Sequence, residues 1–313
     1  RCWSLSAKAF AERLQDNRIW FGSDGNGTPR IKRFLHELKF DGMAPTSILF
    51  YKEVGHSQEG AQEVIKLFDN KGVFDGPKPV RLLERLVTLA NLKADSIVLD
   101  FFSGSATTAH ALMKVNAEKQ TNCKFILVQL PEEVSETKKE QGYKTICEIG
   151  EERIRRAGKK IKEESPLTTQ NLDTGFRVFR LADSNFEEVK KAPAEYNQSQ
   201  LDLFLNNVKS DRTDLDLLFG AMLNWGVQLS LSMTSEEVDG KMIYSVNDGD
   251  LVACFAEDIT ENIVKAMADK QPLRVLFRDS CFARDDAKIN VFETLKQLLD
   301  WSEEEAIKNI KVI

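Results

Sequence analysis

The sequence lacks long apolar runs, paired cysteines and clustered histidines. No stretch of about 18 apolar residues occurs in its 313 residues, so no membrane-spanning helix is expected. Its five cysteines are widely spaced and form no Cys-x-x-Cys pair, which indicates reduced, mostly buried thiols in a cytoplasm. The three histidines are isolated too, so the sequence predicts no metal site.

Two phosphate-binding fingerprints are missing as well. No Gly-Lys-Ser/Thr triplet occurs, which excludes a Walker A loop, and there is no Gly-x-Gly-x-x-Gly turn. The net charge of -6 argues weakly against a nonspecific binder of polyanions. It does not exclude DNA binding, because phosphate contacts depend on local basic patches.

The length and composition indicate a globular protein with about two domains, since 42% of the residues are hydrophobic and 29% are charged. The chain opens on Arg1 without a Met, so we expect a piece of a longer protein. Changes of pattern predict four segments: a mixed segment 1–72, an α/β segment 73–164, a linker 165–175 and a smaller α/β domain 176–313.

The first segment combines a helix, a strand and a basic cluster. Apolar spacing predicts a helix over Ala7–Leu14, and Arg18–Phe21 is strand-like. Gly22–Gly27 is dense in residues that tolerate positive φ, which predicts a turn. The cluster after it either contacts DNA phosphates or forms the solvated edge of a hairpin. Its members are Arg30, Lys32 and Arg33.

The segment 73–164 contains the pattern of a βαβ unit, which forms a parallel sheet with a right-handed crossover. Its predicted elements are the helix Val80–Ala90, the strand Ser96–Asp100, the helix Thr107–Ala117 and the strand Lys124–Leu130. Ligands bind at the carboxyl ends of such strands, where the loop 100–108 lies. Small residues there allow a ligand to approach the backbone, and Ser105 or Thr107 can cap the next helix. Asp100 suits a cationic ligand group.

The stretch Glu148–Glu164 is predicted to be a highly charged helix. Glu151/Arg155 and Glu152/Arg156 are spaced i,i+4, which favours a solvated, self-paired helix. DNA contact by its basic half is the alternative. The six basic residues are Arg153, Arg155, Arg156, Lys159, Lys160 and Lys162.

The second domain has an α/β pattern of its own without a visible catalytic cluster. The predicted strands are Phe176–Phe179, Lys241–Val246, Leu251–Phe255 and Leu273–Phe277, with a hairpin turn at 247–249. The predicted helices are Leu201–Val208, Leu215–Leu223, Ile259–Ala268 and Ile289–Leu299. Arg278–Asp279 and Arg284–Asp286 are interpreted as surface ion pairs.

Two segments resemble motifs of amino-methylating DNA methyltransferases. Val98–Thr108 is similar to their S-adenosylmethionine motif, and Phe74–Pro79 is similar to the partner motif that ends in Lys-Pro before a Leu- and Arg-rich helix. Their order implies the circularly permuted beta class, in which a catalytic Asp-Pro-Pro-Tyr box comes first. The sequence contains no Pro-Pro, so that box is expected before Arg1 and the chain alone is expected not to transfer a methyl group.

Four further stretches resemble the modification (Mod) subunits of type III restriction–modification systems: Trp20–Arg30, Lys52–Glu59, Phe125–Glu132 and Val275–Ser280. The resemblance implies a Rossmann-like methyltransferase sheet and methyl transfer to N6 of a flipped adenine in double-stranded DNA. It further implies a bacterial cytoplasmic protein, a Mod homodimer and a restriction/helicase (Res) partner. The segment 1–72 would end a target-recognition or connecting region, 73–164 would be the cofactor-binding half, and 176–313 would serve assembly.

The resemblance also assigns roles to residues. Asp100 would hold the methionine ammonium, backbone groups of 76–78 the carboxylate, and Gln129 the ribose, while Phe102 would pack against the cofactor. The set implied to bind S-adenosylmethionine is Phe74, Asp75, Gly76, Lys78, Pro79, Asp100, Phe101, Phe102, Ser103, Gly104, Ser105, Ala106, Thr107 and Gln129. Plainer interpretations stay open, with Asp100 as a strand-end or capping acid, Phe102 as core packing and Lys78 as a solvated turn residue.

Two residues depart from the family pattern. Ala106 replaces a usual Gly, and its Cβ is tolerable only if φ is negative. Gln129 stands where relatives carry an acid; it can accept a hydroxyl hydrogen but lacks the stronger charge-assisted bond. We therefore expect weaker, not absent, cofactor binding.

Two other classes of function stay open. The piece could act as a non-catalytic interaction module for Mod dimerisation and Res docking, because the second domain shows no catalytic cluster. It could also belong to an RNA or protein methyltransferase, although the motif order and the Mod-like stretches favour DNA.

Overall fold

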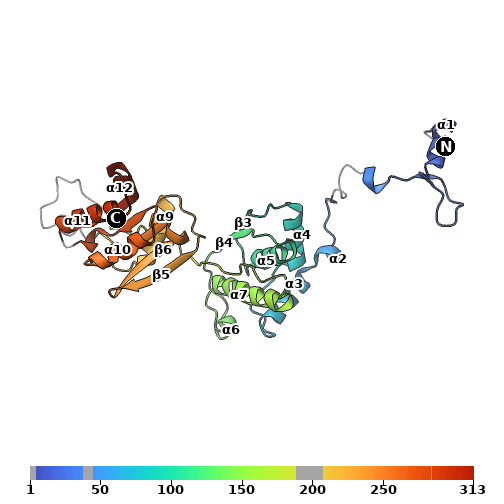
Figure 1. Cartoon of the computed structure of the whole chain (residues 1–313). Coiled ribbons are helices and arrows are strands. Elements are labelled where there is room, and N and C mark those ends of the chain that lie inside the picture. The colour runs from blue at the N-terminus through green and yellow to red at the C-terminus, as the bar shows by residue number, and fades with distance from the viewer. Residues whose placement is uncertain (1–4, 38–44, 188–206, 283) are drawn as a thin grey trace, which may run out of the picture. The chain divides into compact units, whose positions relative to one another are not determined.

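The computed structural model describes residues 5–37, 45–187, 207–282 and 284–313. The chain divides into two compact units, Arg1–Thr174 and Gly175–Ile313, which are coloured from blue to green and from yellow to red in Figure 1. Within the described ranges no helix has both the length and the apolar character needed to cross a membrane.

The described residues 5–37 form a helix and a small hairpin. The helix α1 (Ala7–Gln15) begins after Ser6, whose hydroxyl accepts a hydrogen bond from the Ala9 amide. The strands β1 (Ile19–Trp20) and β2 (Arg30–Ile31) pair antiparallel. The predicted helix, strand and turn are therefore confirmed. A short 3-10 turn follows at Leu35–Glu37.

The remainder of the first unit holds the predicted βαβ unit. Its elements are α2 (Tyr51–Val54), α3 (Ser57–Leu67), α4 (Val80–Leu89), β3 (Ile97–Phe101), α5 (Thr107–Lys119), β4 (Lys124–Val128), α6 (Glu136–Lys139) and α7 (Ile146–Glu164). The strands β3 and β4 pair in parallel with α5 between them in sequence, which confirms that prediction. The helices α2 and α3 were not predicted.

The β3–β4 sheet has one covered face. On that face Val98 and Phe125 pack against a core built from Val87 of α4 and from Leu112 and Val115 of α5. The other face carries a row of apolar side chains that are each 51–63% exposed, namely Ile97, Leu99, Phe101, Ile126 and Val128. The unit is thus mixed α/β with parallel pairing, and the described residues do not include a complete Rossmann-like sheet.

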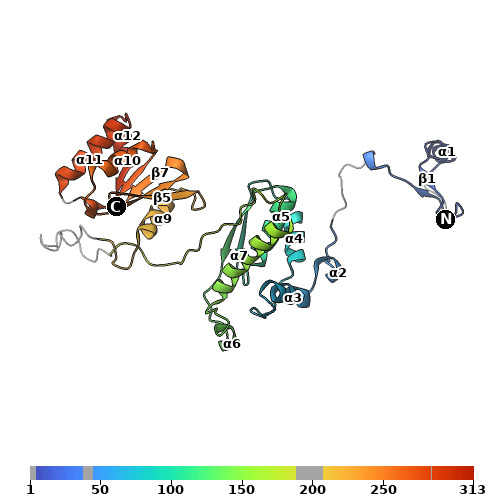
Figure 2. The same cartoon turned by 60° about the horizontal axis from the view of Figure 1, so that its bottom comes forward.

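The helix α7 packs against α5 and α3, and Figures 1 and 2 both show it beside α5. Its buried residues recur at helical spacing and include Ile149, Arg153 and Ala157. Ile149 also joins Val64 of α3 and Phe68, the C-cap of α3, in a second core. The loop between β3 and α5 lies against this helix, because a Cβ added to Gly150 would lie 3.3 Å from the Gly104 oxygen.

The second unit is built on a mixed five-stranded sheet in the order β5-β6-β7-β8-β9. Its strands are β5 (Met233–Val238), β6 (Lys241–Val246), β7 (Leu251–Cys254), β8 (Val275–Phe277) and β9 (Ile310–Val312). Its helices are α9 (Asp214–Asn224), α10 (Glu261–Asp269), α11 (Asp285–Leu298) and α12 (Glu303–Asn309), with 3-10 turns at Asn247–Gly249 and Asp279–Cys281. Pairing is antiparallel from β5 to β7 and parallel from β7 to β9.

This sheet is covered on both faces. Val246, Ala253 and Leu276 join a core with α9, whereas Val252 and Phe277 face the core formed with α10, α11 and α12. Figure 2 shows α9 on one side of the sheet and the other three helices opposite. The second unit therefore has three layers.

Several predictions for the second unit need correction. Phe176–Phe179 is not a strand: the Phe179 ring contacts the Phe219 ring edge-on, with centroids 5.0 Å apart, and Arg177 donates to the backbone oxygens of Leu229 and Leu231. The side chains of Arg177 and Phe179 therefore anchor this segment. The predicted helix Leu201–Val208 lies mostly outside the described residues. The strands β5 and β9 and the helix α12 were not predicted.

The two predicted ion pairs of this unit have different outcomes. Arg284 pairs with Asp286 at 3.1 Å, as expected. Asp279 instead pairs with Lys288 of α11 at 2.6 Å.

Candidate functional site

The loop that joins β3 to α5 has an unusual backbone. Phe102, Gly104 and Ala106 have φ values of 73°, 54° and 60°, in the left-handed region that side chains with a Cβ rarely adopt. The amides of Phe102 and Ser103 both donate to the Val128 oxygen, at 2.7 and 3.1 Å, which ties the loop to the end of β4. The Phe102 side chain is 73% exposed. The loop thus presents a strained, fixed backbone at the carboxyl end of the parallel strands.

The condition that the sequence set for Ala106, a negative φ, is not met, because this residue has a positive φ. It is the N-cap of α5, buried and left-handed, and no side chain caps the helix there. The expected caps, Ser105 and Thr107, direct their hydroxyls to the Arg153 guanidinium instead. A left-handed alanine costs about 1 kcal/mol or more relative to an ordinary backbone, so tertiary contacts must hold it.

Asp100 lies near the end of β3, half-buried beside this loop. One carboxylate oxygen accepts a hydrogen bond from the Thr108 hydroxyl at 2.5 Å. Across the part of the chain that the structure describes, no basic side chain forms an ion pair with Asp100. Its carboxylate therefore lies near the carboxyl end of β3 without a cationic partner from these residues.

Gln129 directly follows β4 and reaches the same loop. Its side-chain oxygen accepts a hydrogen bond from the Gly104 amide at 2.8 Å, and its nitrogen donates to the Leu130 oxygen at 3.3 Å. The sequence had suggested a contact with a ligand hydroxyl for this oxygen, not a bond to the loop backbone. An amide oxygen has two lone pairs, so one remains available after this contact.

The segment 74–79 meets the loop through Phe74. A Cβ added to Gly104 would lie 3.2 Å from the tip of the Phe74 ring, so the ring packs directly on this glycine. Of the predicted site residues in this segment, Pro79 is buried, whereas Asp75, Gly76 and Lys78 are exposed. Asp75 forms an ion pair with Lys138 at 2.6 Å. The two motifs that are separate in sequence thus lie together in the fold.

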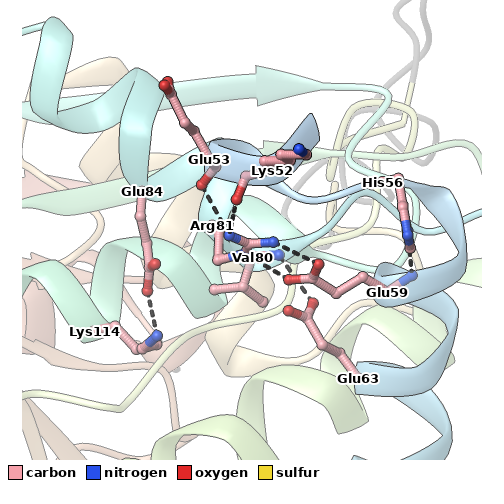
Figure 3. Close-up of polar contacts among 9 residues, drawn as sticks. All are labelled: Lys52, Glu53, His56, Glu59, Glu63, Val80, Arg81, Glu84 and Lys114. Carbon is pink, nitrogen blue, oxygen red and sulfur yellow. Dashed lines mark hydrogen bonds and ion pairs between the residues drawn. The ribbon is translucent and has the colours of Figure 1, made fainter. Parts of the chain in front are cut away.

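A polar clasp, formed by Arg81 and its partners, holds the segment in place (Figure 3). The Arg81 guanidinium makes two bonds to the Glu59 carboxylate, at 2.6 and 2.7 Å. It also donates to the backbone oxygens of Lys52 and Glu53, both at 3.0 Å. The stretch Lys52–Glu59, for which the sequence suggested no chemistry, therefore fixes the helix that begins just after Pro79.

The start of α4 has a second anchor. Its N-cap, Pro79, offers no capping side chain, and the Glu63 carboxylate accepts from the Val80 amide at 2.9 Å instead. Burial raises the pKa of the Glu63 carboxyl. Gly60 allows the backbone at Pro77 to lie close to α3, since a Cβ on Gly60 would lie 2.3 Å from the Pro77 oxygen. Farther along α4, Glu84 forms an ion pair with Lys114 of α5.

The helix α7 is self-paired on its surface, as the sequence indicated. Arg155 pairs with Glu151 at 3.2 Å and Arg156 with Glu152 at 2.7 Å. Arg153 does not belong to this solvated face, because it is fully buried beneath the loop. The sequence spacing indicates this burial, since Arg153 is four residues from both Ile149 and Ala157 and thus shares their apolar face.

The basic cluster, for which the sequence left both DNA contact and a hairpin edge open, begins in β2 of the β1–β2 hairpin. The Arg30 guanidinium lies 5.9 Å from the centroid of the Trp20 ring, and Lys32 donates to the Asn17 side chain at 3.1 Å. Arg33 is exposed. The hairpin interpretation is confirmed, and contact with phosphates stays a prediction.

Comparison with known proteins connects these segments to one family. Residues 17–160 match the DNA methylase family, which places the loop, the segment 74–79 and the clasp inside the matched region.

Three Mod subunits of type III restriction-modification enzymes are similar to this chain. The StyLTI Mod subunit of Salmonella typhimurium is 38% identical over 58% of this chain and 27% of its own length. A Mod subunit from Escherichia coli is 32% identical over 54% of this chain and 24% of its own length. The EcoPI Mod subunit of Escherichia phage P1 is 40% identical over 44% of this chain and 21% of its own length. The chain thus spans about a quarter of the length of these relatives, and it is similar to the DNA methylase family over residues 17–160 and to type III Mod subunits.

Proposed function

We propose that this chain carries the S-adenosylmethionine-binding part of a DNA methyltransferase that modifies the N6 amino group of adenine. The observation that carries the proposal is the Asp100 carboxylate, which lies at the carboxyl end of a parallel strand without a cationic partner from the described residues. Parallel α/β sheets bind their ligands at this edge. A carboxylate with free lone pairs suits a ligand with a positively charged amino group.

The chemical groups around Asp100 are of the types that could bind this cofactor. We propose that Asp100 accepts the hydrogens of the methionine ammonium and that backbone groups of 76–78 hold the carboxylate. The exposed Phe102 ring would pack on the cofactor and exclude water. The remaining lone pair of the Gln129 oxygen would accept from a ribose hydroxyl. When bound, S-adenosylmethionine supplies the methyl group as an electrophile.

The rest of the reaction is proposed for the whole protein, because the chain spans only about a quarter of the length of its relatives. An adenine amino group is reachable only after the base has been flipped out of the duplex. We propose that groups outside this sequence receive the flipped base and accept the amine hydrogens. Double-stranded DNA, a second Mod subunit and a Res subunit are the proposed partners, in a bacterial cytoplasm.

Calorimetric titration of S-adenosylmethionine into the chain tests the proposal, with Asp100→Asn as the variant. Asn keeps the shape of Asp but removes the charge, so we expect the affinity to fall at least tenfold. Asp95→Asn, in the turn before β3, serves as the control and should bind like the parent. A folded parent that binds nothing, or an Asp100→Asn variant that binds equally well, would contradict the proposal.

A further inference from the structure

Arg153 of α7 makes an unusual set of contacts beneath the loop. Its side chain is fully buried, and one terminal nitrogen, Nη1, donates to the hydroxyls of Ser105 and Thr107, both at 2.7 Å. These hydroxyls flank the left-handed Ala106. The other two guanidinium nitrogens are buried and lack a hydrogen-bond partner among the described residues. Among the described residues, the guanidinium of this buried cation therefore donates hydrogen bonds only to the loop.

The stability of the fold does not explain a buried cation at this position. Burial lowers the pKa of Arg153 to about 10, and the more distant Glu63 carboxylate opposes this shift; the guanidinium is still charged at neutral pH. A buried charge without a paired carboxylate loses more in desolvation than it gains, and an apolar side chain of similar volume is often at least as stable. Local departures of this kind concentrate at functional sites.

The packing of α7 shows what Arg153 holds. Gly150 lies one turn earlier, and a Cβ added there would lie 3.5 Å from the Ala106 Cβ. The helix α7 therefore contacts the loop at Gly150, and its Arg153 holds the hydroxyls of Ser105 and Thr107. Positive φ at Phe102 and Ala106 is unfavourable by itself, so an external contact must select this conformation.

We infer that Arg153 is a positioning residue, which holds the loop 102–107 in its ligand-binding conformation without touching the ligand. The inference rests on the proposed function, because it takes the loop to be the cofactor site. A preorganised loop binds its ligand more tightly, since the ordering has already occurred before binding. Arg153 thus exchanges some stability of the fold for a loop that is ready to bind.

The test compares three variants of the 313-residue chain. Arg153→Met removes the donors, Arg153→Lys keeps a charge and donors, and Arg156→Met changes a neighbouring arginine that pairs with Asp69 and Glu152 on the surface. Each is measured by calorimetric titration with S-adenosylmethionine, by thermal unfolding and by amide hydrogen exchange of the loop 102–107 without ligand.

We expect Arg153→Met to bind at least tenfold more weakly than the parent and to exchange its loop amides faster, with an equal or higher melting temperature. Arg153→Lys should recover part of the affinity, and Arg156→Met should bind like the parent. An affinity within twofold of the parent, or faster exchange spread over α5 and α7, would overturn the inference.

Two further outcomes separate this inference from the proposed function. If the parent binds no S-adenosylmethionine, the proposed function fails, and the exchange of the loop amides alone decides whether Arg153 positions the loop. If Arg153→Met does not fold, the double variant Ser105→Ala/Thr107→Val removes the same bonds from the loop side. It should show the same faster exchange, and unchanged exchange would overturn the inference.

Discussion

Ala106 has a backbone conformation that an alanine adopts only at a cost, and three contacts hold it there. Its flanking hydroxyls are held by Arg153, the preceding Gly104 amide is held by Gln129, and its methyl group lies against α7 at Gly150. The φ of 60° is therefore imposed by the surroundings. A residue without a Cβ would adopt the same conformation without this penalty.

Ala106→Gly should stabilise the first unit by about 1 kcal/mol, because the relief of left-handed strain exceeds the added entropy of the unfolded chain. Urea denaturation measures this change. Ala109→Gly, the same substitution inside α5, is the control and should destabilise by about 1 kcal/mol. A destabilised Ala106→Gly would mean that the Ala106 methyl group contributes more by packing than it costs by strain.

His110 makes the stability of the first unit depend on pH. Burial, together with the nearby charges of Arg153 and Lys114, lowers its pKa to about 3. The unfolded chain has a histidine pKa of about 6.5 and so binds more protons between these values. The contribution of neutral His110 to stability is present above pH 6.5 and is lost as the pH falls toward 3.

Urea denaturation between pH 7 and 5 should therefore show the free energy of unfolding falling by up to about 1.4 kcal/mol per pH unit below pH 6. Most carboxylates stay charged in this range, so the slope reports mainly on His110. His110→Gln should remove most of it. A slope that His110→Gln leaves intact would assign the effect to other groups.

At the scale of elements, α3 and α4 are joined through close backbone contact as well as through the Arg81 clasp. Gly60→Ala improves helix propensity by about 1 kcal/mol, yet its Cβ would lie 2.3 Å from the Pro77 oxygen. We expect a net loss of about 2 kcal/mol in the free energy of unfolding, because backbone must move. Gly72→Ala, which meets nothing within 4 Å, should be close to neutral. Equal effects of the two substitutions would show that the segment 77–79 shifts without cost.

The two faces of the β3–β4 sheet should respond differently to truncation. Leu99, on the open face, is 57% exposed, whereas Leu112 is fully buried between α5 and the sheet. We expect Leu99→Ala to cost less than about 1 kcal/mol and Leu112→Ala to cost about 2–5 kcal/mol in urea denaturation. A large cost for Leu99→Ala would indicate that another part of the protein covers this face in solution. Parallel sheets usually have both faces covered, so this face offers a place for further protein.

At the scale of the whole molecule, the two compact units have separate hydrophobic cores. We predict two unfolding transitions in differential scanning calorimetry. Leu276→Ala, in the second core, should lower only one melting temperature, and Leu112→Ala should lower only the other. A single transition that both variants shift would show that the units unfold together.

The sequence predicted local elements best where apolar spacing is strong, as in Val80–Leu89, Ile97–Phe101 and Thr107–Lys119. It missed β5 because this edge strand is mostly polar, with exposed Glu236 and Glu237. It missed β9 because a three-residue strand is specified by its partner β8, which lies far away in sequence. Such pairing depends on long-range contacts that no local pattern records.

The candidate site, too, was predicted only in part from the sequence. The sequence alone determined which residues form the loop and the segment 74–79, because these motifs are contiguous and their small, acidic and proline residues restrict the local backbone. Only the tertiary structure decided that Phe74 packs on Gly104, that Arg81 is bound by Glu59, and that Arg153 holds both sides of Ala106. Contacts between distant elements, not local propensity, stabilise a left-handed alanine and a buried arginine, and such contacts exist only once the chain has folded.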